Sequence, residues 1–168
     1  NNIEKITNGS MKISQIKNVI KWLPTIWNQF DFDYNYSIDV FKFQLEKQAE
    51  YLESEKAHTM DAKDRAKRIR TTLKLMKKVY DEEYAMEYID KMEELYGKDL
   101  LEHELIDTGR GDGTSYYKKK YERTETPERI KEIKDMSNKL WSESNLKQEK
   151  AHRILWLIVE RNIQHWWD

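Results

Sequence analysis

The chain has 168 residues, a length that suits one ordinary domain with its own hydrophobic core. It has no cysteine, which excludes disulfide bonds and thiol catalysis, and its formal net charge of −1 argues against a general polyanion binder. Only five glycines and two prolines interrupt a composition rich in charged residues, tryptophan and tyrosine. We therefore expect an all-α fold, a compact bundle of about five to seven helices with one Gly-rich loop.

The expected domain organisation is simple. We interpret residues 1–10 as a flexible leader or cloning remnant, because Asn8-Gly9-Ser10 is typical of a linker, and residues 11–168 as a single helical domain. The longest apolar run, Ile154 to Val159, is too short to span a bilayer, and no charged-then-apolar leader opens the chain. These features predict a soluble cytoplasmic protein without membrane contact.

In the first third of the chain, helically spaced apolar residues predict a helix over 11–23, which Pro24 ends or kinks. A second helix is expected over about 37–57. Between them lie Asp31 and Asp33, set among aromatic residues. Two carboxylates suit acid–base or metal chemistry, but we favour helix capping by an aspartate.

The clearest predicted helix covers 62–80, where apolar side chains step by four and three as in a heptad seam, which needs a partner helix. The seam consists of Ala62, Ala66, Ile69, Leu73, Met76 and Tyr80. A fourth helix over about 85–95 should end at Gly97, a typical C-terminal cap residue. A weaker pattern suggests a short helix over 98–106.

The last third begins with the Gly-rich loop over 107–115. Thr126-Pro127 predicts a helix start, with Thr as the cap and Pro in the first turn. Asn145 with Gln148 resembles a capping box, which predicts a separate last helix. Because residues 154–159 are apolar on every side, we expect that helix to be the buried centre of the bundle.

Charge is segregated between two neighbouring predicted helices. Residues 61–78 carry eight basic and two acidic side chains, a net of +6, and residues 81–94 carry one basic and seven acidic, a net of −6. We expect the two helices to pair across a hairpin. A phosphate-binding basic face is the alternative.

The best local candidate for a nucleotide or nucleic-acid contact follows the glycines of the loop. Glycines let backbone N–H groups approach an anion, lysines neutralise phosphate and tyrosines can stack on bases. The candidate residues are Arg110, Tyr116, Tyr117, Lys118, Lys119, Lys120 and Arg123. The alternative is a surface loop followed by a solvated charged stretch.

A Glu-x-x-His pattern occurs twice, which is half of a carboxylate-bridged di-iron site. The pairs are Glu55 with His58 and Glu149 with His152. Both lie near predicted helix ends rather than in mid-helix, so they remain weak candidates and we predict neither a metal nor another cofactor. The other histidines, His103 and His165, show no ligand spacing to each other.

The C-terminal Trp166-Trp167 pair either packs on the core or presents a hot spot to a partner, and we favour the core. If the pair is exposed, Trp166 and Trp167 are candidate partner-binding residues together with Arg68 and Arg70. No nucleophile elbow or other catalytic constellation is present in the sequence, which argues against an enzyme.

Three blocks carry a resemblance to a known group. They are Phe30–Tyr34 through Leu52, Ala66–Arg70 through Tyr84, and His152–Trp156 through Asp168. In these blocks the chain resembles small helical proteins encoded by tailed bacteriophages, a group with no known activity. The resemblance implies expression in the cytoplasm of an infected bacterial cell and a counter-defence or host-modulating role.

Together these features predict a stoichiometric binding protein. Its partner would be a host or defence protein, or a nucleotide-like small molecule that it sequesters, and a homo-oligomer stays open. The alternatives are a nucleotide or nucleic-acid binder and a helical metalloenzyme using the Glu-x-x-His pairs.

Overall fold

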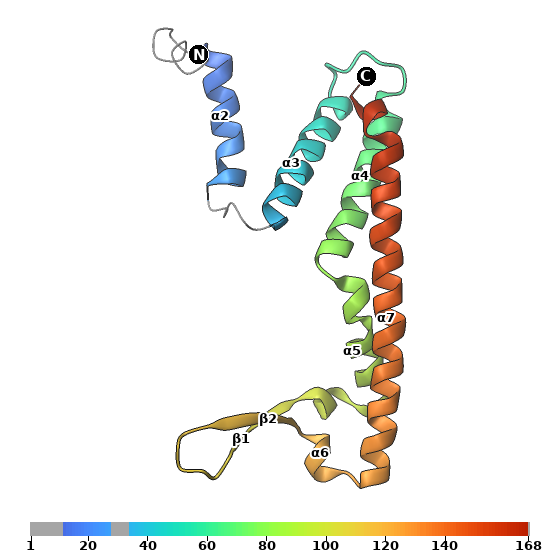
Figure 1. The fold of residues 1–168 in the computed structure, drawn as a ribbon. Coiled ribbons are helices and arrows are strands. Elements are labelled where there is room, and N and C mark those ends of the chain that lie inside the picture. The colour runs from blue at the N-terminus through green and yellow to red at the C-terminus, as the bar shows by residue number, and fades with distance from the viewer. Residues whose placement is uncertain (1–11, 28–33, 168) are drawn as a thin grey trace. The chain divides into compact units, whose positions relative to one another are not determined.

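The computed structural model describes residues 12–27 and 34–167 (Figure 1). The interpretation of residues 1–10, and the roles considered for Asp31 and Asp33, concern residues outside this part of the chain. Within the described residues there are six α-helices and a single two-stranded sheet, which confirms the all-α prediction. These residues belong to two compact units, which are described separately.

Unit 1 comprises residues up to Leu73 and the C-terminal segment from His165, and unit 2 comprises Lys74–Gln164. Unit 1 contains α2 (Ile13–Ile26), α3 (Tyr34–Glu53) and the first part of α4 (Ala62–Tyr80). Unit 2 contains the rest of α4, α5 (Glu83–Tyr96), the 3-10 turn η1 (Lys98–Leu101), β1 (His103–Asp107), β2 (Ser115–Lys119), α6 (Tyr121–Thr124) and α7 (Pro127–Asn162). A second 3-10 turn, η2 (Gln164–Trp166), follows α7.

Helix α2 extends beyond the range predicted for it. It continues past Pro24 to Ile26, because the backbone N–H of Trp27 still donates to the Leu23 carbonyl at 2.9 Å. None of its side chains is buried. It touches α3 through the Trp22 ring, whose centroid lies 4.8 Å from that of Phe43.

Helix α4 has the predicted bounds, and its seam is buried except at Tyr80, which is half-buried. Ala66, Ile69 and Met76 are almost fully inaccessible, whereas the lysines and arginines between them face outward. The i, i+3, i+4 spacing therefore selects the buried face, as expected for an amphipathic helix.

The core of unit 2 forms where α5 and α6 pack on α7. Met92, Tyr121, Ile133 and Leu140 make one buried cluster. At the end of α4, the Gln148 side chain donates to the Val79 carbonyl at 2.6 Å, which ties α7 to the α4–α5 junction. This core fixes the face of α7 that the sheet and α6 approach.

Helix α7 is one continuous helix of 36 residues, so the prediction of two helices is wrong. It starts as predicted, with the Thr126 hydroxyl accepting from the backbone N–H of Arg129 at 3.3 Å. Asn145 lies in its interior. No glycine or proline occurs between Glu128 and Asn162, so nothing in the sequence breaks the helix there.

The apolar run near the end of α7 is only partly buried. Leu155 and Val159 face the core, but Ile154 is 51% exposed and Trp156 and Leu157 are also accessible, so this run is not a buried centre. Within the described residues, no helix is long and apolar enough to cross a membrane.

Residues 98–106 do not form the expected short helix. After η1 the chain enters β1, which pairs antiparallel with β2, with His103 opposite Lys119 and Asp107 opposite Ser115. The predicted Gly-rich loop is present as the turn of this hairpin. Its glycines have positive φ angles, +71° at Gly109, and so favour the turn at no steric cost.

Candidate functional site

The hairpin divides the predicted phosphate-binding residues between two faces. Side chains alternate along a strand, so Tyr116 and Lys118 share one face of β2, and Tyr117 and Lys119 share the other. Directly opposite residues lie on the same face, which places Glu104 beside Lys118. The predicted set is therefore not one continuous basic surface.

The loop itself is stabilised by its own aspartates. Asp107 accepts from the backbone N–H of Gly109 at 2.7 Å, and Asp112 accepts from the backbone N–H of Thr114 at 2.9 Å. The hydrogen bond from the Thr114 hydroxyl is the main cause that lowers the pKa of Asp112. These bonds support an ordinary surface turn, with Arg110 exposed on it, rather than an anion cradle.

Two of the predicted cations already have carboxylate partners. Arg123 forms an ion pair with Glu104 at 2.5 Å, and Lys120 pairs with Glu102 at 3.3 Å. Both pairs are partly exposed, so each contributes little to stability, but each neutralises a side chain that was assigned to phosphate.

The other face of β2 borders a cavity of about 400 Å³, which we call the hairpin pocket. It is lined by His103, Tyr117, Lys119, Tyr121, Glu122, Lys134, Ser137 and Asn138. Five of these residues come from α6 and α7, and none of the five belongs to the predicted set. Sequence reasoning missed them because it did not predict the hairpin whose one face meets α7.

In the described part of the chain, the two charged helices form ion pairs at their junction. Lys77 pairs with Asp81, and Lys78 pairs with Glu83 at 3.0 Å. Further away, α5 is joined to α7 by Lys147 and Glu87, at 2.5 Å. The ion pairs of Lys77 and Lys78 place opposite charges together where the basic helix meets its acidic neighbour.

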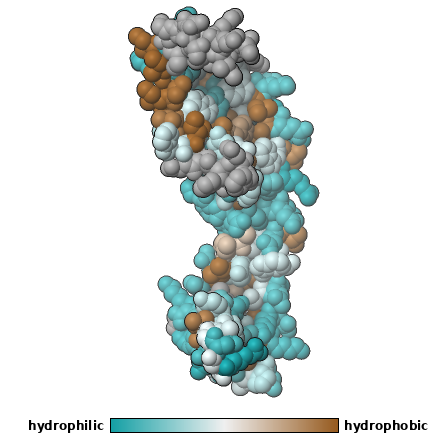
Figure 2. Space-filling view, turned by 60° about the vertical axis from the view of Figure 1, so that its left-hand side comes forward, coloured by the Kyte–Doolittle hydropathy of each residue, from teal (hydrophilic) through white to brown (hydrophobic). Residues whose placement is uncertain are grey.

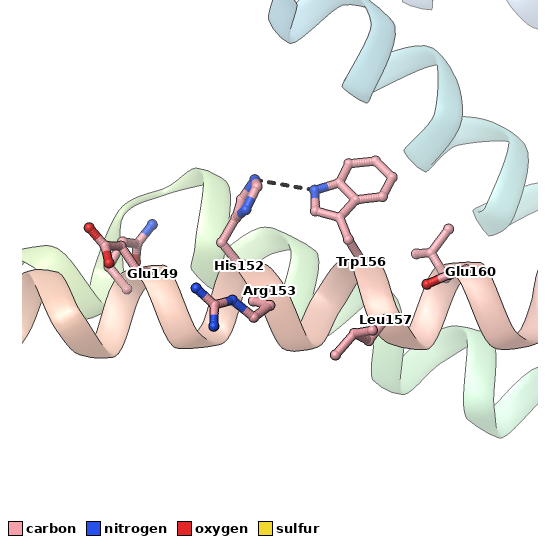
Figure 3. Close-up of a pocket in the computed structure, with 8 residues that line it drawn as sticks. Glu149, His152, Arg153, Trp156, Leu157 and Glu160 are labelled. Atoms are coloured by element: carbon pink, nitrogen blue, oxygen red, sulfur yellow. Dashed lines mark hydrogen bonds between the residues drawn. The ribbon is translucent and has the colours of Figure 1, made fainter.

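The two Glu-x-x-His pairs are not equivalent. Glu55 and His58 lie in the segment after α3, outside a helix, so the spacing does not place them on one helical face. Glu149 and His152 lie on α7, where His152 Nε2 accepts a hydrogen bond from the Trp156 indole at 3.2 Å (Figure 3). In the described part of the chain, no group of three or more potential ligands could hold a metal ion.

This part of α7 borders a cavity of about 830 Å³. Figure 3 shows Trp156 beside His152, with Arg153 and Leu157 on the same helix. The lining combines an indole and an aliphatic side chain with charged groups, which is typical of a surface that takes part in binding.

The residues considered for partner binding differ in accessibility. Trp166 is 2% exposed and its carbonyl accepts from Gln48 at 2.9 Å, so its side chain packs in unit 1 as favoured, whereas Trp167 is 45% exposed. Arg70 forms two hydrogen bonds with Glu53, at 3.0 and 2.8 Å, and this contact raises its pKa and lowers that of Glu53. Arg68 remains exposed.

A further candidate surface is the apolar face of α2, which we call the α2 face. Its members are all exposed: Ile13, Ile16, Val19, Ile20, Leu23, Ile26 and Trp27. Hydrophobic atoms gather accordingly in the upper part of the space-filling view (Figure 2). Residues 12–27 contain three lysines and no carboxylate, so every charged side chain in this segment is basic.

No protein family, no curated protein and no solved structure matches the chain.

Proposed function

We propose that the protein acts by stoichiometric binding of a partner protein, and that the α2 face is its binding surface. The observation that carries this proposal is the exposure of seven large apolar side chains on one side of a single helix. Soluble proteins rarely leave so large a contiguous apolar surface uncovered unless something binds there.

The spacing of the α2 face supports a known mode of recognition. Ile13, Ile16, Ile20 and Leu23 are separated by three, four and three residues, so they project from the same side of the helix. Amphipathic helices bind partner proteins by laying such a row of anchors into an apolar groove. Trp27 is 72% exposed and adds an aromatic anchor at the end of the row.

Charge indicates what the partner's groove should contain. Lys17 lies three or four residues from Ile13 and Ile20, so it borders the row, and Lys21 continues the same edge of α2. The helix has no carboxylate to neutralise these two lysines. An apolar groove with acidic residues at its rim would complement both features. The resemblance to bacteriophage proteins suggests that this partner is a host or defence protein in the cytoplasm of an infected cell.

The experiment compares two double variants with the same change in charge. Ile16→Glu with Ile20→Glu places two carboxylates in the α2 face, and Ser14→Glu with Asn18→Glu places two on the exposed polar side. Each protein is used to capture partners from bacterial lysate, and any captured protein is then purified and titrated against both variants.

We expect a saturable one-to-one complex that the Ile16/Ile20 variant loses and the Ser14/Asn18 variant retains. Equal binding by both variants would contradict the proposal. Light scattering on the isolated protein and sedimentation with anionic vesicles test two other occupants. If the Ile16/Ile20 change abolishes only self-association or only vesicle binding, the α2 face does not serve a partner protein.

A further inference from the structure

The hairpin pocket brings together polar groups from three parts of unit 2. His103 and Lys119 face each other across the two strands, Tyr117 lies on the same face, and Lys134 comes from α7. A cavity of about 400 Å³ is in the range of small-ligand sites. This pocket is separate from the α2 face and does not depend on the function proposed above.

The pocket has a net positive charge. Lys134 and Glu122 form an ion pair at 2.6 Å, and this hydrogen bond lowers the pKa of Glu122 and raises that of Lys134. Both groups are therefore charged near neutral pH and largely offset each other. Lys119 then leaves the lining with an excess of one positive charge, from two lysines against one glutamate.

The aromatic, hydroxyl and amide groups of the lining suit a ligand that is more than an inorganic anion. The Tyr117 and His103 rings stand edge to face, with centroids 6.5 Å apart, and form an aromatic corner beside Lys119. Ser137 and Asn138 provide hydroxyl and amide groups on the α7 side. A planar ring against the aromatic corner and an anion at Lys119 would use both sets of groups.

We propose that the hairpin pocket binds a small phosphate monoester that carries a planar ring, a ligand of the nucleoside monophosphate class. Lys119 contacts the phosphate, and Tyr117 packs against the ring. Of the predicted phosphate-binding residues, Tyr117 and Lys119 therefore belong to the proposed site. Tyr116 and Lys118, on the opposite face of β2, do not.

The alternation of β2 supplies matched controls for the test. Lys119→Gln removes one positive charge from the pocket face of β2, and Lys118→Gln removes one from the opposite face. Tyr117→Leu removes an aromatic ring from the pocket face, and Tyr116→Leu removes one from the opposite face. Binding of the four common nucleoside monophosphates, of inorganic phosphate and of the nucleosides alone is measured by calorimetry at two salt concentrations. Thermal unfolding of each variant checks that it is folded.

We expect at least one monophosphate to bind more tightly than phosphate or its nucleoside. Lys119→Gln should weaken that binding about tenfold, the loss typical of one charge-assisted contact, and Lys118→Gln should not. Tyr117→Leu should weaken it and Tyr116→Leu should not, while Glu122→Gln should strengthen it by removing the negative charge.

Two outcomes would overturn the proposal. One is the absence of saturable binding of every monophosphate up to millimolar concentration. The other is equal loss in the Lys118 and Lys119 variants, which would show diffuse electrostatic attraction. Binding of a single-stranded oligonucleotide that depends equally on both lysines would instead support a nucleic-acid contact outside the pocket.

Discussion

Gly97 ends α5 in a backbone conformation that other residues rarely adopt. Its φ is +94° and its ψ is 158°, and its N–H donates to the Glu93 carbonyl at 2.8 Å. The position was predictable from sequence, because a lone glycine after a periodic apolar pattern is typical of a helix end. Its unusual φ and ψ angles show why the chain needs glycine there.

Replacing Gly97 with alanine should therefore destabilise the fold through the backbone alone. An added Cβ would meet no atom within 4 Å, so steric contact contributes nothing. We expect a loss of about 1–3 kcal/mol in the free energy of unfolding, measured by urea denaturation. Lys98→Ala at the next, exposed position is the control and should change stability by less than about 0.5 kcal/mol. A similarly small change for Gly97→Ala would show that the turn can relax.

At the scale of elements, α7 shows that a sequence resembling a capping box does not start a new helix when it lies inside a continuous one. The Asn145 and Gln148 pair resembles a helix start, yet both lie inside α7. A capping box needs an unpaired backbone N–H at its start, and none arises where the preceding turn is already helical.

Glu143→Pro distinguishes one helix from two. Glu143 is exposed, so the change affects mainly the backbone of α7. In a continuous helix the proline removes one hydrogen bond and clashes with the preceding turn, and we expect a loss of about 3 kcal/mol or more. Circular dichroism during urea denaturation measures the effect, with Glu143→Ala as a near-neutral control. A stable Glu143→Pro variant would indicate a break between two helices.

The sequence predicted long elements better than short ones. The seam of α4 repeats over five steps, so its face and bounds follow from spacing alone. Each strand of the hairpin has only five residues, and β1 has too few apolar positions to distinguish a strand from a helix. The strands depend on each other for hydrogen bonds, and a single segment does not contain that information.

The same reason limits prediction of the candidate sites. Tyr117 and Lys119 could be selected from their chemistry, but their separation from Tyr116 and Lys118 requires the strand. Lys134 required knowledge of which α7 face the hairpin approaches. The α2 face has a clear amphipathic pattern, but a sequence pattern does not say whether an apolar face is covered within the chain.

For the molecule as a whole, burial is unevenly distributed among the described helices. α2 has no buried side chain, whereas α7 contributes six buried residues, and α5 packs on it around Met92. Regions with little buried apolar surface open at low free-energy cost. We therefore expect backbone amides of α2 to exchange with solvent deuterium at least about tenfold faster than those in the centre of α7.

Hydrogen exchange with mass spectrometry measures this difference peptide by peptide. Addition of the purified partner should slow exchange in α2 and leave the centre of α7 unchanged. Equal protection of α2 and α7 in the isolated protein would show that α2 is already covered, and it would remove the main support for the proposed binding surface.

The continuity of α7 has a consequence for how ligands could influence each other. The hairpin pocket uses α7 residues up to Asn138, and the cavity beside Trp156 begins at Gln148, ten residues further along the same rod. At about 1.5 Å per residue, a helical spacer of roughly 15 Å separates the two. Small molecules at these two places would not collide, so any competition between them would have to pass through a change in the helix itself.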